Sequence, residues 1–358
     1  MVGAITLIII VNYRTASLTI DALTSLAPEI ARHPGTRCFV IDNGSGDGSA
    51  EIIADAVRQS GYGDWCQVHA LPDNRGFSAG NNAALALADE QGFAPDLIWL
   101  LNPDTIARPD ALAALVAFME RHPDVGIVGG AAENPDGTPQ YCAFRFPTPL
   151  GEFEAAIGLG VARRLLGRYV IAPSYPDHAV AVHWVSGASM MIRRETFDRI
   201  GRFDERYFLY YEETDFCRRA ADAGIVCWHE PASRIVHLIG QSTGMSGAAR
   251  RLKRRPRYWF ESRARYYRRH LGLAALVAAN VGWLVAYPIG YVLDRLRRRP
   301  SEEAPWLWWD MLRLGWDYQN PPQNGEGDHS KSGGGATSRR RAGPSTGYAG
   351  PPPRSGED

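Results

Sequence analysis

The sequence has no excess of charge of either sign, and its few cysteines are not arranged in pairs. Its 358 residues include 39 basic and 39 acidic side chains, so the overall charge indicates neither a nucleic-acid nor an acidic partner. None of the five cysteines forms a C-x-x-C pair, so the usual sequence signals of a zinc site or a redox motif are missing. An odd number of scattered cysteines is typical of a reducing compartment.

We expect no signal peptide in this sequence, and it contains no evident internal repeat. The first apolar run has no basic segment ahead of it and stops at Asn12. We therefore predict a buried strand at 4–11. The chain is too long for one compact module, so we expect a large α/β unit with an appendage.

Apolar runs alternate with helical stripes in the first part of the chain. Strands are predicted at 4–11, 38–41, 68–71, 97–101 and 126–129, with helices between them, one of which Pro109 opens. This alternation favours a doubly wound, mostly parallel α/β sheet, in which ligands bind beyond the carboxyl ends of the strands. An irregular insertion follows at 134–182, with a helix near 152–166, and a second ordered block covers 183–242.

Polar motifs follow the first two predicted strands. The first is Asn12-Tyr13-Arg14, and the second is a Gly-rich loop that begins at Asp42. An acid at this place can accept hydrogen bonds from a nucleobase or ribose, and the glycines let the backbone approach a ligand. Both segments also fit ordinary turns with a helix cap.

Two further motifs lie near the ends of later strands. The segment NRGFSAGNN (74–82) runs into a helix N-terminus, which favours anions such as phosphate. Asn102-Pro103-Asp104 follows the fourth strand, and Asp104 is placed to hold a divalent cation that bridges two phosphates. A capped helix start and a proline turn are the alternative explanations.

Three acids come after an aromatic run in the second ordered block. Glu212, Glu213 and Asp215 fall at the start of a predicted helix. A carboxylate at a cleft can act as general base on an acceptor hydroxyl. The helix dipole alone would also stabilise acids in a first turn.

Taken in order, these motifs resemble family 2 of the inverting glycosyltransferases, which have the GT-A fold, and within it the bacterial rhamnosyltransferase-like branch. The resemblance covers residues 4–270. It is carried by VNYRT, DNGSGDGS, NRGFSAGNN and LNPD, by the segment from Trp184 to Ala220, and by the pattern His237-x-x-Gly-x-Ser. It implies a GT-A sheet with a C-terminal helical, membrane-associated extension.

The resemblance implies a role for each matched position. Donor-binding positions would be Asn12, Tyr13, Arg14, Asp42, Asn74, Gly76, Gly80, Asn81 and Asn102, with Asp42 on the nucleobase. Asp104 and His237 would hold Mg²⁺ or Mn²⁺ on the diphosphate. The acceptor side would be lined by Trp184, Ser186, Gly187 and Ala188. Glu213 would be the catalytic base, supported by Glu212 and Asp215.

Two positions depart from the family pattern. Asn102 stands where the family often has an aspartate, so metal binding would rest on Asp104 with less help from the protein. Glu213 stands where the base is often aspartate, and Glu212 and Glu213 could exchange roles. A packed or capping histidine explains His237 nearly as well as a ligand does.

The implied activity is transfer of L-rhamnose from dTDP-rhamnose, with UDP- and GDP-sugars as other donors, to a lipid-linked glycan or polysaccharide acceptor. The products would serve cell-surface polysaccharide assembly. Two other functions stay open: a sugar-nucleotide-binding membrane module without turnover, which Asn102 allows, and a nucleotidyltransferase.

The C-terminal part differs in composition from the rest. Residues 250–269 contain ten Lys or Arg and one Glu, and 271–293 contain no charge. We expect a catalytic domain at 1–242 (donor half 1–133, acceptor half 183–242), a basic and apolar helical segment at 243–318 that associates with a membrane, and a disordered tail at 319–358.

The basic stretch would bind an anionic membrane surface, and we expect the protein at the cytoplasmic face of the plasma membrane. Aromatic residues between 258 and 267 would suit an interface belt. Segment 271–293 is long enough to span a bilayer, but Asn280 and Pro288 interrupt it. Peripheral, spanning and re-entrant arrangements all fit.

Overall fold

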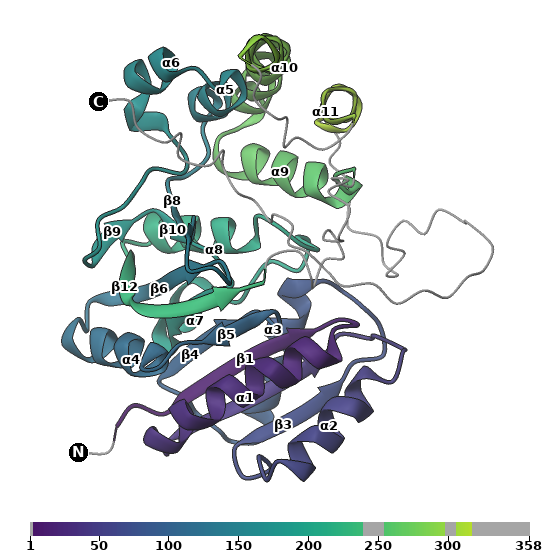
Figure 1. Ribbon diagram of the computed structural model, residues 1–358, viewed down its shortest axis with the longest axis vertical. Helices are drawn as coiled ribbons and strands as arrows, with labels where there is room; N and C mark the ends of the chain where they lie inside the picture. Colours follow the sequence, from purple (N-terminus) through teal and green to yellow (C-terminus); the bar gives the residue numbers. More distant parts are fainter. Residues whose placement is uncertain (1–2, 239–253, 298–305, 317–358) are drawn as a thin grey trace.

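The computed structural model describes residues 3–238, 254–297 and 306–316 (Figure 1). The predicted tail at 319–358 lies outside the described residues, as do the Gly and Ser of the pattern that begins at His237.

The first part of the chain alternates strands and helices, as predicted. Its elements are β1 (Thr6–Asn12), α1 (Ala16–Arg32), β2 (Thr36–Asp42), α2 (Ser49–Gln59), β3 (Cys66–Ala70), α3 (Phe77–Glu90), β4 (Leu97–Leu101), β5 (Thr105–Ala107), α4 (Ala111–Arg121) and β6 (Val125–Glu133). The five expected strands are all present, and β5 is a short addition.

One predicted boundary is wrong: α4 begins at Ala111 and not at Pro109. The cap is Asp110, with a left-handed φ of 67°. The Glu29 carboxylate of α1 accepts hydrogen bonds from the backbone N–H groups of Asp110 and Leu112 at 3.0 and 3.1 Å. The free N–H groups at the start of α4 are therefore hydrogen-bonded by a residue of another helix. The local sequence around α4 does not indicate this partner.

The second part of the chain is more varied. Its elements are β7 (Pro139–Gln140), β8 (Ala143–Phe144), α5 (Pro149–Ile157), α6 (Gly160–Leu165), the 3₁₀ helix η1 (Gly167–Tyr169), β9 (Val180–Val182), β10 (Trp184–Val185), β11 (Ser189–Arg193), α7 (Arg194–Ile200), α8 (Glu212–Asp222) and β12 (Val226–His237). The helix expected near 152–166 is two helices, because Gly158 ends α5 with a left-handed φ of 59°.

The main sheet has the strand order β3-β2-β1-β4-β11-β6-β12-β5, with β7 beside β6 and β9 beside β12. Strands β1 to β4 are parallel, and β12 is parallel to β6. Strand β11 is antiparallel to both of its neighbours. The predicted α/β fold with a mostly parallel sheet is confirmed.

Helices cover both faces of this sheet (Figure 1). Alternate residues of β1 point to opposite faces, so Ile8 and Ile10 pack with α1, α2 and α4. Leu7 and Ile9 pack with the other cluster, which includes residues of α3, α7 and α8. All five cysteines are buried and free.

Three C-terminal helices pack against the rest of the protein: α9 (Arg257–His270), α10 (Leu273–Leu296) and α11 (Leu307–Leu314). The expectation of an aromatic interface belt is wrong for most of α9. Trp259, Phe260, Tyr266 and Tyr267 are buried in a cluster with Tyr207, just before α8. The aromatic residues of α9 therefore pack against the segment before α8.

Helix α10 is one continuous helix that includes Asn280 and Pro288, so the re-entrant pair is wrong. It is the one helix in the described part of the chain that is long and apolar enough to cross a bilayer. It packs along α5, which comes from the irregular insertion. Helices α5 and α6 of the insertion therefore lie with the C-terminal helices at one end of the molecule (Figure 1).

Two glycines of α10 test this packing. A Cβ at Gly290 would lie 2.6 Å from the carbonyl oxygen of Ala156 in α5, whereas a Cβ at Gly282 would lie 3.7 Å from the Phe153 ring. We expect Gly290→Ala to lower the free energy of unfolding by about 1–3 kcal/mol because the two helices must separate. Gly282→Ala should raise it by up to about 1 kcal/mol through helix propensity. Chemical denaturation measures both, and equal effects would contradict the close contact.

Candidate functional site

Asp42 lies at the carboxyl end of β2 and is held by buried hydrogen bonds. Its Oδ1 accepts from Asn12 Nδ2 at 2.6 Å and from Ser45 Oγ at 2.5 Å, and its Oδ2 accepts from Ser45 N at 3.1 Å. The Asn12 Oδ1 atom accepts from the hydroxyls of Thr15 and Thr19. Asn12 thus holds the Asp42 carboxylate in place, and both ends of its side-chain amide are engaged in hydrogen bonds within the protein.

The other predicted residues of this turn lie nearer to solvent. Arg14 is exposed, has a left-handed φ of 57°, and donates from Nε to the Ser45 carbonyl at 3.0 Å. Its guanidinium lies 5.1 Å from the centre of the half-buried Tyr13 ring. The turn after β1 is therefore bound to the loop after β2.

The loop before α3 contacts the segment before α8. Asn74 Oδ1 accepts from the backbone N–H of Gly76 at 2.9 Å and from Asn43 Nδ2 at 3.0 Å. Gly76 has a φ of 92°, and a Cβ there would lie 2.2 Å from the carbonyl oxygen of Phe208. That carbonyl accepts from Phe77 N at 2.8 Å. A residue with a side chain at Gly76 would separate this loop from the segment before α8.

Helix α3 approaches β1 closely. A Cβ at Gly80 would lie 2.7 Å from a methyl group of Val11. Asn81 is buried, and its Nδ2 donates to the Phe77 carbonyl at 2.9 Å. Its Oδ1 has no hydrogen-bond partner among the described residues. Asn82, which was not among the predicted site residues, bonds to both backbone groups of Phe203.

Asp104 and His237 meet although 133 residues separate them (237 − 104). Strand β5 pairs with β12 so that Thr105 faces His237, and Leu238 N donates to the Asp104 carbonyl at 2.8 Å. His237 Nε2 lies 3.4 Å from Asp104 Oδ1 and 3.4 Å from Asn102 Nδ2. The structure thus brings the two predicted metal ligands together.

This pair fits a cation that is shared with a ligand. No cluster of three or more His, Cys, Asp or Glu side chains that could hold a metal occurs in the described part of the chain. Mg²⁺ and related cations often take one or two protein ligands and complete their shell with water and phosphate oxygens. Asp104, which is 1% exposed, and His237 provide such a partial set.

The loop at 186–188 connects the Asp104 pair to the acids of α8. The carbonyl of Ala188 accepts from Asn102 N at 3.2 Å. A Cβ at Gly187 would lie 4.0 Å from Glu213 Oε1 and 3.4 Å from the Phe77 ring. Ser186 Oγ accepts from Ala188 N at 3.3 Å and shapes this loop.

Trp184 lies in the short strand that leads into this loop. It is 6% exposed, stacks on Phe144 with ring centres 4.2 Å apart, and donates from Nε1 to the Arg145 carbonyl at 3.0 Å. Its ring therefore anchors the strand that leads into 186–188.

Glu212 and Glu213 begin α8, where Glu212 is buried and Glu213 is half-buried. Burial raises the pKa of Glu212, and the neighbouring Glu213 carboxylate raises it further. Burial also raises the pKa of Glu213. The Oε2 atoms of both residues have no hydrogen-bond partner among the described residues. The preceding Tyr210 and Tyr211 both have left-handed φ, of 70° and 68°, a strained geometry that is common at functional sites.

Asp215, one turn into the same helix, has the opposite environment. Burial raises the pKa of its carboxyl group, but the hydrogen bond to His270 and the ion pair with Arg219 outweigh burial, so the pKa lies below its usual range. The distances are 2.7 Å from His270 Nε2 to Oδ1 and 2.9 Å from Arg219 Nε to Oδ2. Asp215 is thus an ionised anchor for α8.

His270 and Arg219 are partners of Asp215 that were not among the predicted site residues. The sequence does indicate Arg219, because residues four apart on a helix are neighbours and Arg219 lies four positions after Asp215. It does not indicate His270, since that residue comes from α9, which is 55 residues away. Ser45, the partner of Asp42, stood in the Gly-rich loop but was not singled out.

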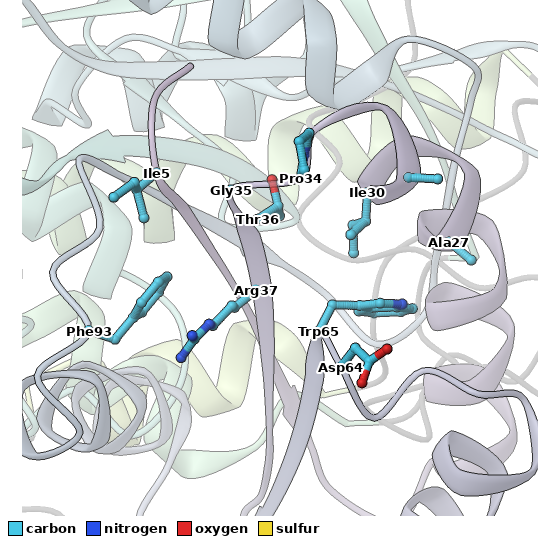
Figure 2. Close-up of a pocket in the computed structure, with 11 residues that line it drawn as sticks. Ile5, Ala27, Ile30, Pro34, Gly35, Thr36, Arg37, Asp64, Trp65 and Phe93 are labelled. Atoms are coloured by element: carbon cyan, nitrogen blue, oxygen red, sulfur yellow. The ribbon is translucent and has the colours of Figure 1, made fainter. Parts of the chain in front are cut away.

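An open pocket of about 500 Å³ lies at the opposite end of the sheet (Figure 2). Its lining includes Ile5 just before β1 and Thr36 at the start of β2, with Arg37, Trp65 and Phe93 around them. The predicted site residues are at the carboxyl ends of these strands. The pocket therefore takes no part in the site described above.

Two protein-family descriptions match parts of the chain. Residues 7–161 match the family described as glycosyl transferase family 2. Residues 97–314, more than half of the chain, match the one described as glycosyl transferase family group 2.

Individual relatives are also similar. The chain is 29% identical over 220 residues to an N-acetylglucosaminyl-diphospho-decaprenol L-rhamnosyltransferase of Mycobacterium tuberculosis (strain CDC 1551 / Oshkosh), covering 59% of this chain and 69% of the relative. It is 30% identical over 166 residues to rhamnosyltransferase WbbL of Escherichia coli (strain K12), covering 45% of this chain and 60% of the relative.

A solved structure shares the fold. It is the mannosyltransferase PcManGT of Pyrobaculum calidifontis in complex with GDP-Man and Mn²⁺. The TM-score is 0.52 at 17% identity, and the match covers 84% of this chain and 76% of that one.

The Asp215 anchor gives a prediction about stability. We expect Asp215→Asn to lower the free energy of unfolding at pH 7 by about 2–4 kcal/mol, because it leaves the Arg219 guanidinium and the His270 ring without their buried carboxylate partner. Because the pKa of Asp215 is lowered in the folded state, its contribution is present above the unfolded pKa of about 3.9 and is lost as pH falls through the folded pKa.

Urea denaturation at pH 7 measures this loss, and repeating it at lower pH follows its disappearance. The matched control is Asp222→Asn, which removes a surface ion pair with Arg218 on the same helix and should cost only about 0–1 kcal/mol. Equal losses in the two variants would contradict the anchoring role.

Proposed function

Because this chain belongs to glycosyl transferase family group 2 and is a glycosyltransferase, we propose that it transfers L-rhamnose from dTDP-rhamnose with inversion. The acceptor we propose is a lipid-linked glycan or a polysaccharide. The rhamnosyltransferase names of two relatives support the choice of sugar. The observation that carries the proposal is the contact chain from His237 and Asp104 through the loop at 186–188 to Glu213.

The donor would lie along the carboxyl ends of β1, β2 and β4. Asp42 would accept hydrogen bonds from the nucleobase, with Asn12 and Ser45 holding its carboxylate in place. The diphosphate would lie near the N-terminus of α3, where Asn74 orders the loop and Gly76 and Gly80 permit close approach of the backbone.

Asp104 and His237 would hold a divalent cation, Mg²⁺ or Mn²⁺, with Asn102 beside them. When bound, such a cation neutralises the negative charge of the leaving diphosphate. The protein's part is to place one carboxylate and one imidazole at the edge of the donor site.

Glu213 would take the proton of the acceptor hydroxyl. Its raised pKa gives it stronger basicity than an ordinary carboxylate, and its Oε2 has no competing hydrogen bond among the described residues. Glu212 would share the proton of the pair, and Asp215 would hold the helix. One displacement from the face opposite the leaving group inverts the anomeric centre.

A lipid-linked acceptor would place the enzyme at the cytoplasmic face of the plasma membrane. The relative from Mycobacterium tuberculosis is named for a decaprenol-linked acceptor. The apolar helix α10 is compatible with membrane association. A binding module without turnover is the second candidate, because Asn102 replaces an acid that family members often have.

The cation and donor are tested by thermal shift. We expect dTDP with Mn²⁺ to raise the melting temperature of the wild type and to have no such effect on Asp104→Ala, because the cation loses its carboxylate. The control is Asp177→Ala, at an exposed position away from the site, which should behave like the wild type. A shift that persists in Asp104→Ala would contradict the metal role.

The base is tested by substitution of Glu213. Glu213→Gln should lower kcat by about 10²–10⁴-fold while the dTDP shift is kept. Glu213→Asp should retain part of the activity. The assay is rhamnose transfer from dTDP-rhamnose to a short-chain analogue of the decaprenol-linked acceptor.

The dependence of transfer activity on pH provides a further test of Glu213. Because burial raises the pKa of Glu213, activity should fall as pH decreases through a value above the ordinary glutamate pKa of about 4.3. Full activity of Glu213→Gln alongside a loss in Glu212→Gln would transfer the role to Glu212. No transfer by the wild type with any donor, despite the dTDP shift, would favour the binding module.

A further inference from the structure

Helix α10 has an uncovered apolar face. Its exposed large residues recur every three or four positions, which places them along one side of the helix. We call this set the apolar ridge; it comprises Leu273, Val277, Val281, Val285, Ile289, Val292 and Leu296, each at least 41% exposed. No charged residue interrupts the ridge before its last turn.

Exposed tryptophans lie in and next to α11, which packs against α10. Trp308 donates from Nε1 to the Leu284 carbonyl at 3.0 Å and so fixes α11 to α10. Trp306, Trp309 and Trp316 are 65%, 49% and 37% exposed. Tryptophan is enriched where an apolar phase meets water, because its ring is apolar and its N–H is polar.

Exposed arginines lie on the same group of helices. Arg163 and Arg164 are in the last turn of α6, Arg297 follows α10, and Arg313 is in the last turn of α11. Helices α5, α6, α10 and α11 lie together at the end of the molecule away from β3 (Figure 1). Cationic side chains beside an apolar surface match anionic headgroups above acyl chains.

The other face of α10 argues against a bilayer-spanning helix. Asn280, in the first half of α10, accepts from the buried Arg263 at 2.6 Å, and Arg263 pairs with the buried Glu152 of α5. If α10 crossed the membrane in this arrangement, this ion pair would lie within the hydrocarbon region. Ionisable groups there are costly, whereas an in-plane helix keeps them on its protein side.

We propose that α10 lies in the plane of an anionic bilayer, with the apolar ridge and the exposed Trp306, Trp309 and Trp316 inserted at the boundary of headgroups and acyl chains. This inference rests on the proposed function, since a lipid-linked acceptor requires a membrane. Helix α9 packs against α10, and its His270 holds Asp215 of α8. With α10 at the membrane, the contacts through α9 and α8 therefore fix the distance of Glu213 from the lipid surface.

Vesicle flotation of the full chain tests the proposal. We expect binding to vesicles that contain phosphatidylglycerol, and weaker binding to phosphatidylcholine alone. Val281→Glu combined with Val285→Glu should lower the binding constant at least about tenfold, because two apolar side chains are lost from the inserted surface. The matched control is Ile52→Glu, a similarly exposed apolar residue of α2, which should bind like the wild type.

Two results would overturn the proposal. One is unchanged flotation of the double variant. The other is a dimer in lipid-free solution that the double substitution dissociates, which would make the ridge a contact between two copies. Flotation needs no donor, so the dTDP thermal shift of the double variant shows separately whether the donor site is intact and whether the variant folds.

Discussion

The antiparallel pairing of β11 between β4 and β6 is the constraint on which the site depends. In an all-parallel sheet, the segment before a strand lies at the edge opposite the ligand site. Because β11 runs in the other direction, Ser189 pairs with Leu101 at the end of β4. The loop at 186–188 is thereby brought to the carboxyl edge, where it contacts Asn102 and lies beside Glu213. One reversed strand thus brings the loop that lies beside Glu213 to the same edge as Asn102.

Environment gives three carboxylates of one helical turn different properties. Glu212 and Glu213 lie beside each other, largely shielded from water, and their pKa values are raised. Asp215 is fully buried, but His270 and Arg219 lower its pKa. Titratable groups whose surroundings push their pKa values apart are a usual basis for dividing roles in a site. We therefore propose proton transfer by the pair and positioning by Asp215.

The sequence predicted what depends on local pattern. Apolar runs located the five main strands, and polar residues at their ends located Asp42 and Asp104. The contact of Asp104 with His237 could come only from the family resemblance, because it depends on the pairing of β5 with β12. The burial of the α9 aromatic residues was mispredicted, since composition does not tell a protein surface from a lipid surface.

The central claim is that one nucleotide-diphosphate donor occupies the edge formed by Asp104, His237 and Glu213. The most direct measurement is anomalous diffraction at the manganese edge from crystals grown with Mn²⁺ and dTDP. We predict one manganese peak beside Asp104 and His237, with the nucleobase at Asp42. A peak elsewhere, or dTDP bound away from β1, β2 and β4, would contradict it.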